Sequence, residues 1–111
     1  MSAHREPLLR TLAVVAASML VGSVAAAPVV HTVTIEGFEF HPPTVTVNRG
    51  DVVVWRNQDP VPHTATAKDA GLDSREIPAG GSFRFTAAAR AGRFEYVCTL
   101  HPTMKAVLVV D

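Results

Sequence analysis

From Val29 to the C-terminus, apolar and polar residues alternate in short runs, and this period of two limits the fold more than any other feature. The runs are rich in β-branched and aromatic residues, and clusters of Pro, Gly, Asn and Asp separate them, as is typical of turns. They cover residues 31–35, 44–47, 51–55, 82–85, 93–97 and 105–110. We therefore predict an all-β fold, an antiparallel Greek-key β-sandwich of seven to eight strands.

Aromatic residues lie two positions apart at three places in or beside these runs. The pairs are Phe38 and Phe40, Phe83 and Phe85, and Phe94 and Tyr96. Residues two apart in a strand share one face of the sheet, so we expect each pair to face the core. Trp55 is expected in the core as well.

Residues 1–26 are predicted to be a secretory signal peptide. Arg5 and Arg10 give a positively charged start, and an uncharged apolar run rich in Ala, Val and Leu follows. Cleavage before Ala27 avoids placing Pro28 directly after the cut, so the expected mature domain is residues 27–111. We expect it to be periplasmic or otherwise exported. The alternative is a retained membrane anchor, since residues 11–30 are long enough to span a bilayer.

The net charge and the cysteine count of the chain argue against a nucleic-acid partner and against a disulfide within the chain. The formal net charge is +0 at pH 7 and no basic tract appears, so no nucleic-acid partner is expected. The single cysteine excludes an intramolecular disulfide, which small exported domains commonly use to supplement a limited core. A metal ion that binds only the folded chain would stabilise the fold in place of a disulfide.

The only cysteine lies in the segment CTLHPTM, where Cys98, His101 and Met104 follow one another at intervals of three. Residues at i and i+3 eclipse one another in a tight, 3₁₀-like turn, so the three side chains are expected to point into one space. Pro102 disfavours a continuing helix, so we predict a turn between two strands. A buried cysteine or methionine alone is ordinary core, but a lone thiol in an exported protein is prone to oxidation.

A thiolate, an imidazole and a thioether suit copper, and a copper site of this kind takes a second imidazole. His63 is the candidate, because it follows a loop stiffened by Pro60 and Pro62. The other histidines lie in the signal or near the N-terminal strands and are not expected to bind the functional metal; they are His4, His31 and His41. Zinc would make little use of Met104.

The segments GDVVVWRNQDPVPHTAT, PAGGSFRF and FEYVCTLHPTM resemble type 1 (blue) copper proteins of the cupredoxin superfamily, and the short ligand loop is similar to that of amicyanins. Plastocyanins and pseudoazurins are looser relatives. The resemblance covers residues 33–111 and implies a cupredoxin-like domain. It implies one copper ion, held by equatorial His63, Cys98 and His101 and by axial Met104. It also suggests that Asn57 braces the two ligand loops, with Thr99 beside the thiolate as a partner.

The resemblance implies a small soluble electron-transfer protein that cycles between Cu(II) and Cu(I) and is not an enzyme. Expected partners are redox proteins such as a c-type cytochrome, a dehydrogenase or a reductase, with no membrane contact once the signal is removed; we expect a monomer. The alternative is a copper carrier or sequestering protein of the cell envelope, which would usually expose Met- or His-rich tracts that this chain lacks.

One position departs from the amicyanin pattern. Such loops usually carry proline between the threonine after the cysteine and the histidine ligand, whereas this chain has Leu100. Leu100 has a backbone N–H, which we expect to donate a hydrogen bond to the sulfur of Cys98 and so to raise the reduction potential.

Overall fold

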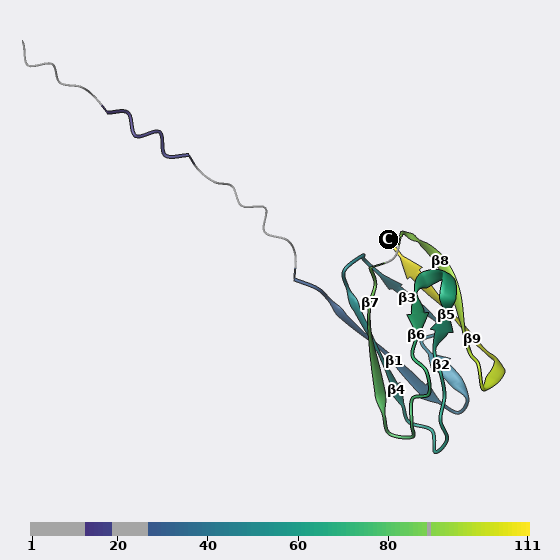
Figure 1. The fold of residues 1–111 in the computed structure, drawn as a ribbon. Coiled ribbons are helices and arrows are strands. Elements are labelled where there is room, and N and C mark those ends of the chain that lie inside the picture. Colours follow the sequence, from purple (N-terminus) through teal and green to yellow (C-terminus); the bar gives the residue numbers. More distant parts are fainter. Residues whose placement is uncertain (1–12, 19–26, 89) are drawn as a thin grey trace, which may run out of the picture.

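The computed structural model of the chain describes residues 13–18, 27–88 and 90–111. The part from residue 27 onward folds into two facing sheets (Figure 1). The first sheet has the strand order β2-β1-β4-β7, with bounds β1 (Val30–Glu36), β2 (Glu39–His41), β4 (Val52–Asn57) and β7 (Ser82–Thr86). The second has the order β3-β9-β8-β5-β6, with bounds β3 (Thr44–Val47), β5 (Thr66–Ala67), β6 (Leu72–Asp73), β8 (Gly92–Cys98) and β9 (His101–Val110). A single 3₁₀ turn, η1 (Lys68–Ala70), joins β5 to β6.

The all-β sandwich predicted from the sequence is confirmed, with two differences of detail. The sheets are mixed and not purely antiparallel, because β1 pairs with β4, and β3 with β9, in parallel. The described part of the chain contains nine strands, where seven to eight were expected. The unpredicted strands are β2, β5 and β6, which have only two or three residues each and are too short to show a period.

The core lies between the sheets, and aromatic side chains from both of them meet there. Tyr96 of β8 packs edge-on against Trp55 of β4, with ring centroids 5.6 Å apart, and against Phe40 of β2 at 4.8 Å. Burial raises the pKa of Tyr96 to about 12, so its hydroxyl stays protonated at physiological pH. Cys98 follows on the same strand and belongs to the same buried cluster. The metal-ligand candidate on β8 is therefore anchored directly in the core.

Phe38 is the aromatic residue for which the core prediction is wrong, because its side chain is 47% exposed. Its neighbour Phe40 is buried, and Phe83 and Phe85 pack partly buried against the core. The reason is local. Gly37 and Phe38 form the turn between β1 and β2, with φ angles of 61° and 57°. Two successive positive φ angles are typical of a type I′ hairpin turn, which takes Phe38 out of the strand alternation.

The predicted signal peptide, residues 1–26, lies outside the described residues apart from 13–18, so its cleavage stays a prediction. Among the residues that the structure describes, no helix has the length and apolarity needed to cross a membrane.

A buried carboxylate fixes the end of the sandwich at which β1 and β4 begin. Asp51 accepts hydrogen bonds from the N–H of Val29 at 3.1 Å and of Asn48 at 3.0 Å, and it pairs with Nε2 of His31 at 3.0 Å. The hydrogen bond with His31 and the two amide bonds hold the pKa of Asp51 below its usual value. Asp51 thus joins the start of β1 to the turn that precedes β4.

We predict that Asp51→Asn lowers the melting temperature at neutral pH, because one carboxamide oxygen cannot replace two carboxylate oxygens for three donors. A lowered folded-state pKa contributes stability that is fully present above the unfolded value of 3.8 and is lost as the pH falls through the folded-state value. The difference in melting temperature between wild type and variant should therefore shrink as the pH is lowered below 3.8. Thermal unfolding followed by circular dichroism measures it. The exposed Asp69→Asn serves as control, and a pH-independent difference for Asp51→Asn would contradict this account.

Candidate metal centre

His63 lies at the end of the loop after β4, and hydrogen bonds fix its backbone. It forms an isolated bridge with Ile77 through two backbone hydrogen bonds of 3.2 and 2.7 Å. Asn57 braces the same loop, since its Nδ2 donates to the carbonyls of Val61 at 2.8 Å and Ile77 at 3.0 Å. The imidazole of His63 is fully buried. The position of this ring is therefore set by the loop itself.

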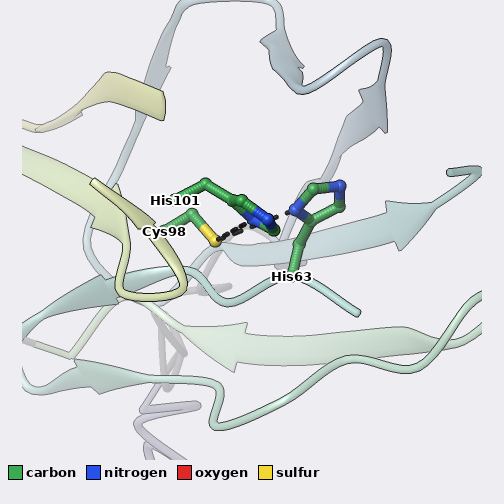
Figure 2. Close-up of side chains that lie close together, drawn as sticks. All are labelled: His63, Cys98 and His101. Carbon is green, nitrogen blue, oxygen red and sulfur yellow. Dashed lines mark hydrogen bonds between the residues drawn. The ribbon is translucent and has the colours of Figure 1, made fainter. Parts of the chain in front are cut away.

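Asp59 sets the orientation of the His63 ring. Its Oδ2 lies 2.7 Å from Nε2 of His63, and the carboxylate is 6% exposed. A carboxylate on Nε2 holds the proton at that nitrogen and leaves the lone pair on Nδ1. Nδ1 is the nitrogen that faces the sulfur of Cys98 (Figure 2). The pairing thus prepares His63 to act as a metal ligand through Nδ1.

The same carboxylate holds the turn between β1 and β2. Its oxygens accept hydrogen bonds from the N–H groups of Gly37 at 2.7 Å and Phe38 at 2.9 Å. Burial raises the pKa of Asp59, but the bonds from Phe38, Gly37 and His63 outweigh it, and the pKa is lowered overall. A left-handed phenylalanine costs about 1–2 kcal/mol. Two hydrogen bonds to a charged acceptor, about 1.5–3 kcal/mol each, offset this strain.

A bulged hairpin places the other candidates. Cys98 ends β8 and pairs across the hairpin with His101, the first residue of β9, whereas the preceding Val97 pairs with Lys105. The residues between His101 and Lys105, which include Met104, therefore have no partner on β8. In a regular strand, His101 and Met104 would point to opposite faces, because they are three residues apart. The bulge removes this restriction.

The predicted turn between two strands is confirmed, with Cys98 and His101 on either side of it. The regular spacing of three does not extend to Met104 as one tight turn, because His101 already begins β9 and Met104 lies in the bulged part of that strand. The turn proper is formed by Thr99 and Leu100. A bulge of this kind depends on the register of β9 against β8, which the sequence of the segment alone does not reveal.

Three ligand atoms converge between the two loops (Figure 2). The Sγ of Cys98 lies 3.8 Å from Nδ1 of His63 and 3.7 Å from Nδ1 of His101. All three atoms lie within 4.8 Å of one another. Ligands that each stand about 2.0–2.3 Å from one ion lie roughly 3–4 Å apart, so this spacing can accommodate a metal ion.

The structure thus brings together three of the four predicted ligands. Met104 is 4% exposed and belongs to the same core cluster as Cys98. Metal binding by these four residues stays a prediction. Of the histidines not expected to bind it, His31 pairs with Asp51, and His41 lies on the surface, 3.5 Å from Glu39. His4 lies outside the described residues.

Thr64 joins the two ligand loops, and the sequence reasoning missed it. Its N–H donates to Sγ of Cys98 at 3.3 Å, and its Oγ1 accepts from the N–H of Thr99 at 2.8 Å. The Oγ1 also accepts from the hydroxyl of Thr66 at 3.2 Å and lies 3.0 Å from the hydroxyl of Thr99. A hydroxyl accepts two hydrogen bonds and donates one, so Thr64 directs its own proton to the hydroxyl of Thr99.

Two sequence-based expectations about this bridge are therefore wrong. Asn57 braces the His63 loop and does not link it to the Cys98 loop. In the described part of the chain, the backbone donor to the sulfur is Thr64 and not Leu100, which lies in the hairpin turn and is 44% exposed. A signal was available: a threonine directly follows the predicted ligand in both His63-Thr64 and Cys98-Thr99.

Comparison with known proteins agrees with this geometry. The chain matches the cupredoxin-like domain family over residues 9–110. Amicyanin-alpha of Methylorubrum extorquens is 31% identical over 86 residues, which cover 71% of this chain and 70% of that protein. Amicyanin of Paracoccus versutus is 30% identical over 83 residues, with 71% of this chain and 63% of that protein covered, just under two thirds of its length.

Solved structures of the same kind are similar in fold. A reduced Cu(I) form of an amicyanin variant has a TM-score of 0.65 at 28% identity, with 80% of this chain and 87% of that chain covered. A copper-containing nitrite reductase from Thermus scotoductus has a TM-score of 0.68 at 26% identity. In that case 82% of this chain is matched but only 24% of the enzyme.

We predict that Thr64→Val lowers the free energy of unfolding of the metal-free protein by about 1–2 kcal/mol, because the partly buried N–H of Thr99 loses its acceptor. Valine has a similar shape and keeps the N–H that bonds to Cys98. Urea unfolding followed by the fluorescence of Trp55 measures the change. The control is Thr44→Val at an exposed position of β3, expected to change it by less than about 0.5 kcal/mol. Equal stabilities of the two variants would contradict a stabilising role for the Thr64 hydroxyl.

Proposed function

This chain belongs to the cupredoxin-like domain family, and on that premise we propose that it is an electron-transfer protein with one type 1 copper site. The observation that carries the proposal is the convergence of Nδ1 of His63, Nδ1 of His101 and Sγ of Cys98 in one largely buried space. We assign these residues as the equatorial ligands and Met104 as the axial ligand. Export to the periplasm, removal of residues 1–26 and a monomeric state belong to the same proposal.

The donor set fits copper. A thiolate, two imidazoles and a thioether combine soft and intermediate donors, so they suit both Cu(I) and Cu(II). When bound, copper would supply one-electron chemistry by changing between these two states. Asp59 accepts the hydrogen bond from Nε2 of His63 and so turns Nδ1 toward the site, and the N–H of Thr64 draws electron density from the sulfur of Cys98. The second effect favours the reduced state.

The chain holds its candidate ligands rigidly. His63 is fixed by Ile77 and Asp59, and the Thr64 bridge ties its loop to the hairpin of Cys98. Ligands that do not move when an electron arrives or leaves make the reorganisation small and the transfer fast. The proposed electron-transfer function thus explains why so many hydrogen bonds hold the His63 loop and the Cys98 hairpin.

His101 is the proposed exit for the electron. Among the three clustered residues, His63 and Cys98 are fully buried, whereas His101 is partly exposed. The apolar residues Leu100 and Pro102 flank it and are exposed. A small apolar surface around a ligand suits brief docking of a redox partner, such as a c-type cytochrome, a dehydrogenase or a reductase.

Two other classes of function have weaker support. A copper carrier would have to pass on its ion, but His63 and Cys98 are buried and held by hydrogen bonds from the two loops. The nitrite reductase is an enzyme, yet this chain matches only 24% of it, and metal catalysis needs an open coordination position that the proposed four-ligand site does not leave.

We predict that the folded chain with one equivalent of Cu(II) shows an intense blue band from thiolate-to-copper charge transfer. Cys98→Ser should abolish this band and leave the sandwich folded, while Met104→Gln should keep a coloured but altered site. Copper should also raise the melting temperature, because it binds the folded chain. Absorption spectra and circular dichroism test this, with the exposed His41→Ala as control. A Cys98→Ser protein that stays blue would contradict the ligand assignment.

We also predict that Pro102→Glu slows electron exchange with a c-type cytochrome roughly tenfold, because an unpaired carboxylate must be desolvated in the contact. The blue band should change little. Stopped-flow mixing of the reduced protein with oxidised cytochrome measures the rate. The control, Thr86→Glu, adds the same charge at the opposite end of the sandwich, where β7 pairs with the start of β4. Equal rates for the two variants would place the docking surface elsewhere.

A further inference from the structure

Phe38 closes a cluster of three rings at the proposed metal centre. Its ring lies edge-on to His63, with centroids 5.1 Å apart, and to His101 at 5.0 Å, and the interplanar angle is 86° in both cases. The two imidazoles are themselves 5.1 Å apart. The three rings therefore form a nearly equilateral triangle in which Phe38 covers both imidazoles from one side.

Phe38 also lines a groove that is open to solvent. The groove has a volume of about 390 Å³, and its walls include His41, Thr103, Met104 and Lys105. Met104 is the proposed axial ligand, so solvent in this groove comes close to the site. Phe38 is the residue that belongs both to the groove and to the ring cluster. It therefore contacts both the solvent in the groove and the two imidazoles.

The position of Phe38 is not explained by core packing. Nearly half of its side chain is exposed, at 47%, and its φ of 57° lies in the region that favours glycine. The carboxylate of Asp59 holds it there and also holds Nε2 of His63. Strained residues that the surrounding structure fixes in place tend to occur at functional sites. The strain at Phe38 is tied to a ligand through a single carboxylate.

We propose that Phe38 is a partition that keeps water and small anions in the groove away from the metal. This inference rests on the type 1 copper function proposed above. A solvent ligand that joined Cu(II) and left on reduction would enlarge the reorganisation, so a site that exchanges electrons rapidly benefits from a closed coordination shell. Phe38 acts here as a positioning residue, because it contacts the ligand rings and not the metal.

The test uses the copper-loaded full-length chain and azide, a small anion that gives its own absorption when it binds Cu(II). Azide should leave the spectrum of the wild type unchanged. In Phe38→Ala, azide affinity should rise roughly tenfold or more. The same rise is expected in Phe38→Gly, which is included because glycine adopts the left-handed turn without strain and should therefore fold normally. Relaxation of water protons by Cu(II) should increase in both variants. The control is Thr103→Ala, which widens the same groove without removing the ring that covers the imidazoles.

Azide binding by the two Phe38 variants, but not by Thr103→Ala, would support the partition. Unchanged azide exclusion and unchanged water relaxation in both Phe38 variants would overturn it. Equal azide binding by Thr103→Ala would also overturn it, because any widening of the groove would then suffice. A wild-type protein without a blue band would instead overturn the proposed function, so the two failures are distinguishable.

Discussion

The carboxylate of Asp59 is the interaction on which the organisation of the proposed centre depends. It is almost fully buried, and burying an unpartnered carboxylate is costly, so its donors must stay in place. These donors come from separate parts of the chain: the turn between β1 and β2 and the ring of His63. Satisfying one charge thereby orients a ligand, holds a strained turn and places Phe38 over the imidazoles.

A second set of hydrogen bonds connects this unit to the other sheet. Thr64 follows His63 directly, and it bonds both to the sulfur of Cys98 and to the residue after it. The His63 loop runs from β4 of the first sheet to β5 of the second, and β5 pairs with β8 through Thr66 and Val97. Continued by two residues, this antiparallel register places Thr64 opposite Thr99, where the hydroxyl of Thr64 extends the link between the two loops beyond the ladder.

Sequence reasoning succeeded where a pattern is long or chemically distinctive. The six strands located by residue range each show an alternating pattern, and the clustering of His63, Cys98 and His101 was expected because few other roles explain those residue types at that spacing. It failed where the outcome depends on backbone geometry. Phe38 shares the spacing of a strand pair but occupies a left-handed turn, and the donor to the sulfur is set by the approach of two loops. Neither the approach of distant loops nor a bulge leaves a local pattern.

Asp51 and Asp59, the two buried aspartates on either side of β4, help to distinguish the native register of β1 and β4 from shifted registers. β1 and β4 are both rich in β-branched residues, and a slip of two positions would keep every side chain on its own face. The native ladder has an offset of 22 residues. The same offset occurs in two hydrogen bonds outside the ladder. Val29 donates to Asp51 just before the ladder begins, and Gly37 donates to Asp59 just after it ends. A slipped pairing would leave a buried carboxylate without these donors at both ends of the ladder. The two aspartates therefore specify the register, which the repetitive apolar strands alone do not.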